Sequence, residues 1–413
     1  MPTPAASMAG ATRLAERLLR GERAALSKAI TLVESTAARS RPAADALLDR
    51  TLSLRAAAAS ASDGAPTSAT EPSASRGLLR IGISGPPGAG KSTLIEALGM
   101  EMVNRGHRLA VLTVDPSSAH SGGSVLGDKT RMQKLSADRR AFVRPSPACG
   151  HLGGVARRTH DAMALCESAG FDRLVVETVG VGQSEVAVAS LVDVFVLLVP
   201  PAAGDELQGI KRGIMELTDI VIVTKADGRL RAAAGEAARQ LRAALKVLRP
   251  PPAATASAAS PAWKPWTPIV LEVSSIAAAN SDLGALEAVP TSSNGASDSD
   301  RTSGAARAPN VAATASASKS ARTPADVADV LEAFHEATAA SGQLLGRRRT
   351  QAVSAVQNHA WTALVERMGR SAAAEQLIAS LAVEVASRRL AVSAAAERVA
   401  DALLAPPADS PKV

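Results

Sequence analysis

A glycine-rich stretch directly after a short apolar run carries the clearest chemical signal in the sequence. It follows the phosphate-binding pattern Gly-x4-Gly-Lys-Ser/Thr. Glycines let backbone NH groups approach a diphosphate closely, Lys91 would reach the β and γ phosphates, and the Ser92 hydroxyl is a typical Mg²⁺ ligand. Residues 78–84 predict a strand before the loop and residues 93–105 a helix after it, which makes an accidental glycine-rich turn a poor alternative. The predicted nucleotide-binding residues of this loop are Gly85, Pro86, Pro87, Gly88, Ala89, Gly90, Lys91, Ser92 and Thr93.

A second motif indicates which base the nucleotide carries. Val221-Ile-Val-Thr-Lys-Ala-Asp227 is similar to the Asn-Lys-x-Asp element of guanine-binding proteins. The Asp227 carboxylate can accept hydrogen bonds from guanine N1 and from its exocyclic amine, and adenine lacks that pair of donors. Lys225 would lay its aliphatic stem along the base. Thr224 stands where asparagine is usual, and its hydroxyl can still make one hydrogen bond. We therefore predict GTP rather than ATP.

A serine-rich turn follows the apolar run at residues 269–273. Ser274, Ser275 and Ile276 lie where a further loop could offer backbone NH groups to the guanine oxygen. Taken alone, these residues describe only a turn. They are predicted guanine contacts because of their position after a strand.

Three acidic residues could complete a Mg²⁺ site. Asp115 and Glu177 follow predicted strands, and Asp128 lies in the loop Gly-Gly-Ser-Val-Leu-Gly-Asp-Lys-Thr-Arg-Met132. Mg²⁺ prefers carboxylate, hydroxyl, phosphate and water oxygens. Each acid alone could be a solvated loop charge or a helix cap. The spacing Glu177-x-x-Gly180 stands where GTPases usually place Asp-x-x-Gly, so the NH of Gly180 could sense the γ-phosphate and move a loop on hydrolysis.

The elements that must position these residues alternate between strands and helices. Strand-like runs occur at residues 78–84, 109–114, 173–176, 192–199, 220–224 and 269–273, and helical patterns separate them. This alternation predicts an α/β fold, with a mainly parallel sheet, helices on both faces and ligand sites at the carboxyl ends of the strands.

Additional segments flank the predicted nucleotide domain. Helical spacing predicts an N-terminal helical hairpin, and two segments rich in Ala, Ser and Thr predict flexible connections. After residue 325, two apolar stripes predict long amphipathic helices. One runs from Val327 to Phe334 and the other from Val353 to Met368, and neither has an obvious place on a sheet covered by its own helices. Domain packing and a subunit interface both remain open for them. The predicted parts are a helical extension (1–58), a linker (59–76), a P-loop GTPase domain (77–284), a disordered insertion (285–325) and a C-terminal helical region (326–413).

Composition excludes several other classes of protein. The 413 residues carry a formal net charge of +7, yet only 2% are aromatic and none is tyrosine, so platforms that stack nucleic-acid bases are hard to build. Arg347, Arg348 and Arg349 form the only compact basic run. Cys149 and Cys166 cannot form a disulfide framework, and we interpret both as small buried residues. No apolar run approaches the length of a membrane span. We predict neither nucleic-acid nor membrane binding and no secretion, and an organellar presequence stays open.

Four motifs together resemble one family, the GTPase chaperones of methylmalonyl-CoA mutase (MeaB and MMAA type). They are Val114-Asp-Pro-Ser-Ser118, the loop that contains Asp128, Glu177-Thr-Val-Gly-Val-Gly-Gln-Ser-Glu185 and Gly204-Asp-Glu-Leu-Gln-Gly-Ile-Lys-Arg-Gly213. The resemblance covers residues from about 12 to 370. It implies a GTPase that gates the loading of adenosylcobalamin into the mutase or protects that enzyme, with the cobalamin on the partner. It also implies a homodimer formed through C-terminal helices, in the mitochondrial matrix or, alternatively, in the cytoplasm.

The resemblance also implies roles for individual residues. Ser92, Asp115, Asp128 and Glu177 would surround Mg²⁺. Lys91 and Gln183 are the candidate catalytic residues, Gln183 as the position nearest in logic to a switch glutamine. Residues that would couple the nucleotide state to the partner are Gly180, Asp205, Glu206 and Lys211.

Two other activities fit a P-loop protein of this broad class. A small-molecule kinase, acting on an amino acid for example, would need a second pocket for the acceptor, and no acceptor signature is visible in the sequence. A metal-inserting GTPase would need a Cys or His cluster. Cys149, His151, His160 and Cys166 lack convincing ligand spacing, so this is the weaker alternative.

Overall fold

The structure is a computed structural model and describes residues 4–35, 37, 40–62, 77–115, 132–147, 152–178, 184–201, 212–248, 266–275, 322–369 and 371–404. Within these residues, seven parallel strands form one sheet in the order β3-β2-β4-β1-β5-β6-β7. The strands are β1 (Leu79–Ser84), β2 (Leu109–Asp115), β3 (Ala141–Pro147), β4 (Arg173–Thr178), β5 (Val194–Val199), β6 (Ile220–Val223) and β7 (Ile269–Glu272). The predicted α/β fold with a parallel sheet is confirmed.

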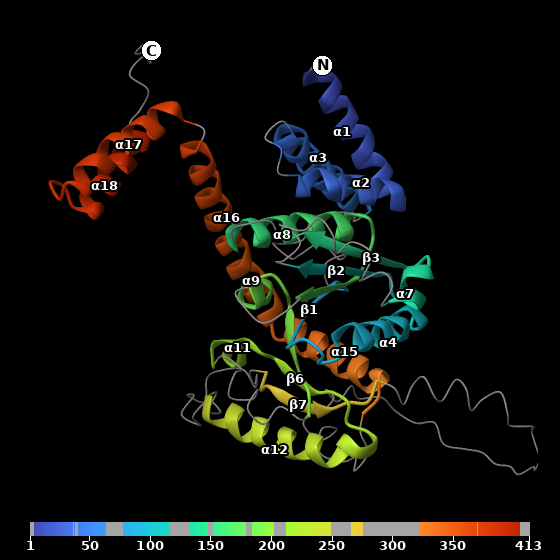
Figure 1. Ribbon diagram of the computed structural model, residues 1–413. Coiled ribbons are helices and arrows are strands. Elements are labelled where there is room, and N and C mark those ends of the chain that lie inside the picture. The colour runs from blue at the N-terminus through green and yellow to red at the C-terminus, as the bar shows by residue number, and fades with distance from the viewer. Residues whose placement is uncertain are drawn as a thin grey trace, which may run out of the picture. The chain divides into compact units, whose positions relative to one another are not determined.

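Helices cover both faces of the sheet (Figure 1). One face carries α8, α9, α11 and α12, and the other carries α4, α7 and α15. The helices of the sheet domain are α4 (Lys91–Asn104), α7 (Gln133–Ala137), α8 (Leu152–Ser168), α9 (Ser184–Ala189), α11 (Arg212–Leu217), α12 (Arg231–Leu248) and α15 (Pro324–Ala340). A short 3₁₀ helix, η3 (Gly228–Leu230), precedes α12.

Side chains along each strand alternate between the two apolar layers, because successive residues of a strand point to opposite faces. In β1, Ile81 and Ile83 belong to the layer that contains α4. In β4, Leu174 and Val176 belong to the opposite layer, which contains α8. All six residues of β5 are buried, as expected for a central strand of a parallel sheet.

The sequence analysis missed one strand, β3, which lies at the edge of the sheet beyond β2. Its sequence contains Pro145 and Pro147, and proline cannot donate a hydrogen bond to a neighbouring strand. An edge strand tolerates proline because one of its sides needs no partner strand. The two prolines therefore made this segment look unlike a strand in the sequence, although it can pair at the edge of the sheet.

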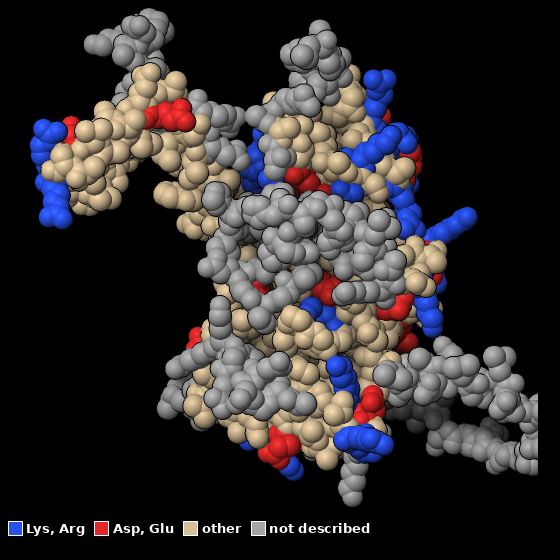
Figure 2. Space-filling model, viewed as in Figure 1, with Lys and Arg blue, Asp and Glu red and all other residues tan. Residues whose placement is uncertain are grey.

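Three helices, α1 (Pro4–Leu19), α2 (Arg23–Glu34) and α3 (Arg41–Ser62), form the N-terminal part and pack together and against α8. The predicted first helix is divided because Gly21 has φ 77°, a value that ends a right-handed helix. Basic side chains in this region are interspersed with acidic ones on the face in view (Figure 2). Glu22, for example, pairs with both Arg17 and Arg20.

A buried ion pair anchors α2 to the edge strand. Arg144 of β3 donates to Glu34 of α2 at 2.6 Å, and its second terminal nitrogen lies 3.3 Å from the carbonyl oxygen of Ser27. Charged groups that leave water need such partners, since an unpaired buried charge is strongly unfavourable. The N-terminal helices therefore cover the edge of the sheet through specific contacts.

The apolar stripe of α15 belongs to the core of the sheet domain. Val327, Leu331 and Phe334 are almost fully buried and pack with the layer that contains α4. The expectation that this stripe has no place on the sheet is therefore wrong. It failed because helical spacing reveals an apolar face but does not identify the surface that the face covers.

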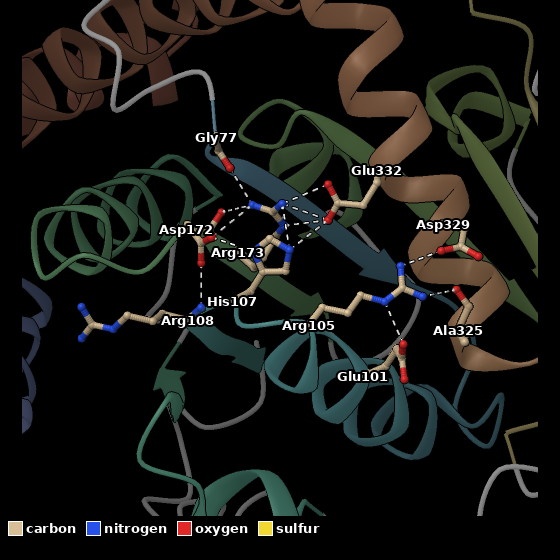
Figure 3. Close-up of polar contacts among 10 residues, drawn as sticks. All are labelled: Gly77, Glu101, Arg105, His107, Arg108, Asp172, Arg173, Ala325, Asp329 and Glu332. Carbon is tan, nitrogen blue, oxygen red and sulfur yellow. Dashed lines mark hydrogen bonds and ion pairs between the residues drawn. The ribbon is translucent and has the colours of Figure 1, made fainter. Parts of the chain in front are cut away.

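Charged contacts hold α15 against the strands and α4 (Figure 3). Glu332 accepts two hydrogen bonds from the terminal nitrogen of Arg173, at 2.9 and 3.0 Å. Arg173, at the start of β4, also donates to the carbonyl oxygen of Gly77. Arg105, directly after α4, donates to Asp329 of α15 at 2.6 Å. These contacts orient α15 along α4.

Backbone pairing and helix capping are present just before α15. Thr323 and Asp326 form a reciprocal capping box at the start of the helix, which satisfies backbone NH groups that the first turn leaves without partners. Arg322 forms a parallel bridge with Val273, directly after β7. Residues 322–325 were predicted as the end of a disordered insertion, and the structure places them in this paired and capped arrangement. Residues 285–321 lie outside the described part of the chain.

Two arginines at the start of α16 (Gln343–Met368) bind two buried aspartates. Arg348 donates to both carboxylate oxygens of Asp193, at 2.9 and 2.8 Å. Arg347 donates to both oxygens of Asp219, at 2.9 and 3.0 Å. Burial alone would lower the pKa of Arg347, but the hydrogen bonds to Asp219 and the negative charges of Asp219 and Asp193 together hold that pKa above its usual value. Two of the three arginines of the basic run, Arg347 and Arg348, therefore form ion pairs with buried aspartates.

The chain forms two compact units, residues 1–351 and residues 352–413. The second unit contains the remainder of α16 together with α17 (Ala372–Ala386) and α18 (Val392–Leu404), which pack against each other. Its part of α16 carries apolar side chains that are 41–70% exposed, namely Val353, Val356, Trp361, Leu364 and Val365. Among the described residues, no helix has the length and apolar character needed to cross a membrane.

Replacing Asp193 by alanine should lower the free energy of unfolding by about 3–5 kcal/mol, because Arg348 would remain buried without its counter-ion. Urea denaturation followed by circular dichroism measures this effect. Asp45→Ala is the matched control, since Asp45 pairs with Arg41 at the surface, where such pairs contribute about 1 kcal/mol or less. Equal effects of the two substitutions would contradict the anchoring role of the buried pair.

Candidate functional site

The phosphate-binding loop joins β1 to α4 and has a backbone that requires glycine. Gly85 has φ 154°, and a Cβ atom there would lie 2.4 Å from the carbonyl oxygen of Leu198, so no larger residue fits. Gly90 precedes α4 in a left-handed conformation, and no side chain caps the helix. No side chain of the residue before the helix therefore occupies the first NH groups of α4. NH groups at a helix start that are left in this way can bind a phosphate.

Lys91 lies across the beginning of this loop. Its Nζ donates to the carbonyl oxygens of Gly85 at 2.7 Å and Pro86 at 3.1 Å, and the side chain is buried. These neutral acceptors hold the ammonium group beside the loop. A phosphate oxygen is a stronger acceptor for a cation than a carbonyl, so this placement suits exchange of partners when a nucleotide binds.

Two of the predicted Mg²⁺ ligands lie next to each other. The Ser92 hydroxyl donates to Oε1 of Glu177 at 3.2 Å, and Glu177 is 3% exposed at the end of β4. A hydroxyl and a carboxylate at the carboxyl edge of the sheet are oxygen donors of the kind that Mg²⁺ selects, so the residues fit this ion. Asp115 ends β2, the neighbour of β4, but its side chain lies outside the described part, as does the whole of Asp128.

Thr224 connects the guanine motif to the phosphate-binding loop. Its hydroxyl donates to the carbonyl oxygen of Ala89 at 2.7 Å, and the side chain is buried. The next residue, Lys225, has φ 53° and is exposed. The left-handed turn thus places the lysine side chain at the surface beside the loop. Sequence reasoning treated Thr224 only as a departure from the usual asparagine and missed this link.

Asp227 is oriented by a serine from the following loop. The Ser274 hydroxyl donates to Oδ2 of Asp227, and Ser274 is almost fully buried. Its backbone NH donates to the carbonyl oxygen of Arg322 at 3.0 Å. Ser274 therefore contacts Asp227 through its side chain, and its backbone NH is already bonded to Arg322. The guanine contacts of Ser275 and Ile276 stay predictions.

Several predicted residues lie outside the part of the chain that the structure describes. These are Asp128, Gly180, Gln183, Asp205, Glu206, Lys211 and Ile276. In the sequence, Gly180 and Gln183 lie between β4 and α9, and residues 204–211 precede α11. Their roles remain predictions.

Cys166 is poorly suited to bind a metal. It is fully buried in α8 as a free thiol, and burial raises its pKa above the usual value. The thiolate, which is the form that binds metals, is therefore disfavoured. The interpretation of Cys166 as a small buried residue is confirmed, and Cys149 lies outside the described residues.

Comparisons with known proteins agree with this geometry. A family model described as "Methylmalonyl Co-A mutase-associated GTPase MeaB" matches residues 26–374. The chain belongs to the MeaB family of GTPases. The match begins within α2 and extends into α17, so the helices on both sides of the sheet domain are included.

Individual relatives show how much of the chain the similarity covers. The chain is 54% identical over 237 residues to a mouse protein named "Methylmalonic aciduria type A homolog, mitochondrial", a match that spans 57% of this chain and 55% of that protein. It is 49% identical to a putative GTPase of Caulobacter vibrioides, over 65% of this chain and 73% of that protein. The chain thus spans about half the length of the mouse relative.

A solved structure, titled as a "LAO/AO transport system kinase", superposes on nearly the whole chain. The TM-score is 0.60 at 27% identity, and the alignment covers 98% of this chain and 100% of that one. This likeness supports the α/β fold of the sheet domain.

Thr224→Val should weaken GTP binding about 3- to 10-fold, because it removes the hydrogen bond to Ala89, a contact of about 0.5–1.5 kcal/mol, and keeps the shape of the side chain. Equilibrium titration with a fluorescent guanine nucleotide measures the change. Thr224→Ser retains the hydroxyl and should bind nearly as the wild type does. If both variants bind equally well, the link between the two loops has no part in nucleotide binding.

Proposed function

We propose that this protein is a Mg²⁺-dependent GTPase that acts as a chaperone for methylmalonyl-CoA mutase. The observation that carries the proposal is the connection between three loops at one edge of the sheet. Thr224 ties the guanine motif to Ala89, and Ser92 of the same phosphate loop meets Glu177. Guanine recognition, phosphate binding and metal binding therefore share one rigid frame, as GTP hydrolysis requires.

Each described residue has a distinct task in this reaction. Lys91 and the NH groups at the start of α4 hold the phosphate oxygens, and Asp227, oriented by Ser274, recognises guanine. Ser92 and Glu177 would hold Mg²⁺, which neutralises charge that develops on the transferred phosphoryl group. Water attacks the γ-phosphate in line with the leaving oxygen. Gln183 and the segment around Gly180 are proposed to orient that water and to report the nucleotide state.

The proposed partner follows from the family and from the names of relatives. The family is described as mutase-associated, and the mouse and Caenorhabditis elegans relatives are named for methylmalonic aciduria type A and as mitochondrial. We propose that the protein controls the loading of adenosylcobalamin into the mutase and protects that enzyme, with the cofactor held by the mutase. A mitochondrial matrix location follows the same names, and the bacterial relatives support the cytoplasm as the alternative.

A small-molecule kinase is the second candidate, because the solved structure that covers 98% of this chain is titled a transport system kinase. The Escherichia coli relative, 45% identical over 56% of this chain, is named "GTPase ArgK". The two activities differ only in what accepts the γ-phosphoryl group. Incubation with γ-labelled GTP separates them: label released as inorganic phosphate supports the GTPase, and label on an added amino acid such as arginine or ornithine supports the kinase.

Lys91→Ala should abolish GTP hydrolysis, at least 100-fold below the wild type, because the ammonium stabilises charge on the phosphates in the transition state. Phosphate release under saturating GTP and Mg²⁺ measures the rate, and circular dichroism confirms the fold. Lys246→Ala is the control, since Lys246 is exposed on α12. A folded Lys91→Ala protein with wild-type turnover would refute the assignment of the loop.

The exposed stripe of α16 supports the homodimer that the resemblance implies. Its apolar side chains in the C-terminal unit are far more exposed than the stripe of α15, and a large exposed apolar surface commonly marks an interface. We propose that a second copy of the chain covers the stripe. Paired subunits would then present their switch segments to the mutase together.

Val356→Glu in the full chain should convert the dimer into a monomer at micromolar concentration, because a carboxylate would be buried at the interface. Light scattering measures the mass. GTP binding should survive, but the mutase should no longer stimulate hydrolysis. Val247→Glu, the same substitution at an exposed valine of α12 outside the stripe, should leave the dimer intact. A wild-type chain that is already monomeric would refute the proposal.

A further inference from the structure

Two buried hydroxyl groups join the ends of the strands that carry the site. Thr178 Oγ1 donates to Ser84 Oγ at 2.8 Å, and the two residues are 0% and 1% exposed. Ser84 is the last residue of β1 and directly precedes Gly85. Thr178 is the last residue of β4 and directly follows Glu177. The bond therefore lies between the origin of the phosphate-binding loop and the carboxylate of the proposed metal site.

The register of the sheet separates this pair from the site itself. β1 and β4 are parallel neighbours, and Ile83 is paired with Glu177. Glu177 points toward α4, where it meets Ser92. Because side chains alternate along a strand, Thr178 and Ser84 point to the opposite face. They do not face the proposed metal site, but each is covalently adjacent to a residue that belongs to the nucleotide site.

The pair shares its face of the sheet with apolar residues. Val176 lies two residues before Thr178 in β4, Val114 of β2 is paired with Thr178, and Val199 ends β5, all in the layer that contains α8. A valine in place of Thr178 would match the shape of the side chain and would suit these neighbours. A hydroxyl pair instead adds a directional contact whose net stabilisation is only about 1 kcal/mol. Its distinctive property is that it defines the alignment of the two strand ends.

Alignment matters here because the donors of the proposed metal site come from two different elements. Ser92 is connected to β1 through the loop, and Glu177 belongs to β4. A shift of β4 along β1 would move Glu177 away from Ser92, and a slip of one residue would turn it to the other face. A displacement of about 1 Å in a catalytic group can reduce a rate about 100-fold. The hydroxyl bond restrains this displacement at the point where both loops leave the sheet.

We propose that Ser84 and Thr178 are positioning residues for the Mg²⁺ site, and that their hydrogen bond sets the separation of the Ser92 hydroxyl and the Glu177 carboxylate. The inference rests on the proposed GTPase function. Neither hydroxyl touches the nucleotide or the metal. Their loss should therefore affect steps that depend on Mg²⁺ and should leave binding through the guanine and phosphate loops nearly intact.

Thr178→Val tests this directly, because it removes the hydroxyl and preserves the shape. We expect kcat for GTP hydrolysis to fall about 10-fold and KM to change less than about twofold. Binding supplies a readout independent of turnover. The affinity for N-methylanthraniloyl-GDP without Mg²⁺ should equal that of the wild type, and the Mg²⁺ concentration that half-saturates the effect of the metal should rise about 5- to 10-fold.

Further variants separate positioning from general stability. Thr178→Ser should restore the Mg²⁺ response, and Ser84→Ala, which removes the partner hydroxyl, should reproduce the effect of Thr178→Val even if that variant folds poorly. The double variant should be no worse than either single one. Thr51→Val is the matched control, because Thr51 is equally buried and its hydroxyl donates at 2.7 Å to the carbonyl oxygen of Leu47 within α3. It should leave the Mg²⁺ response unchanged.

The outcomes distinguish this inference from the function on which it rests. An unchanged Mg²⁺ response in both Thr178→Val and Ser84→Ala, with normal wild-type hydrolysis, would overturn the positioning role alone. An equal change in the Thr51→Val control would also overturn it, because loss of stability would then explain the effect. A wild-type chain without Mg²⁺-dependent GTP hydrolysis would overturn both proposals.

Discussion

The parallel pairing of β1 with β4 on one side and β5 on the other is the constraint on which the candidate site depends. Parallel strands end at the same edge of a sheet, so loops that are distant in sequence emerge side by side. The phosphate loop leaves β1, and Glu177 lies one residue before the end of the neighbouring strand β4. On the other side, β6 follows β5 in the sheet and carries Thr224 to within hydrogen-bond distance of Ala89. No single segment forms the candidate site. The pairing of the strands brings its residues together at one edge of the sheet.

The opposite ends of the strands show what holds this sheet in place. Asp193 and Asp219 precede β5 and β6, and each accepts a hydrogen bond from a strand NH group, of Arg80 and Phe195 respectively. Buried carboxylates need compensating charge, and Arg348 and Arg347 of α16 supply it. The first residues of α16 are therefore part of the structure that supports the nucleotide site.

The sequence analysis succeeded where a residue type has one physical explanation. The glycines of the phosphate loop and the apolar strand runs define both the sheet and the loop, because few other structures satisfy those patterns. It missed β3 because Pro145 and Pro147 are unfavourable in any strand except one at an edge. It misplaced α15 because an apolar stripe does not reveal its partner. The link from Thr224 to Ala89 joins positions 135 residues apart, and no local pattern encodes a contact across that separation.

The basic run at residues 347–349 shows that a cluster of charges in the sequence can serve the interior of the protein. In the sequence it is the only compact group of positive charges, and a surface group of that kind would suit an acidic ligand. The structure pairs its first two members with aspartates that are almost fully buried. The Arg347 guanidinium lies over the ring of Phe334, which Trp266 meets in an edge-to-face arrangement. Charge clustering here follows from the need to neutralise two buried carboxylates at adjacent strands. The carboxylates, in turn, satisfy NH groups of the central strands, so the arginines of α16 complete the sheet whose other edge forms the site.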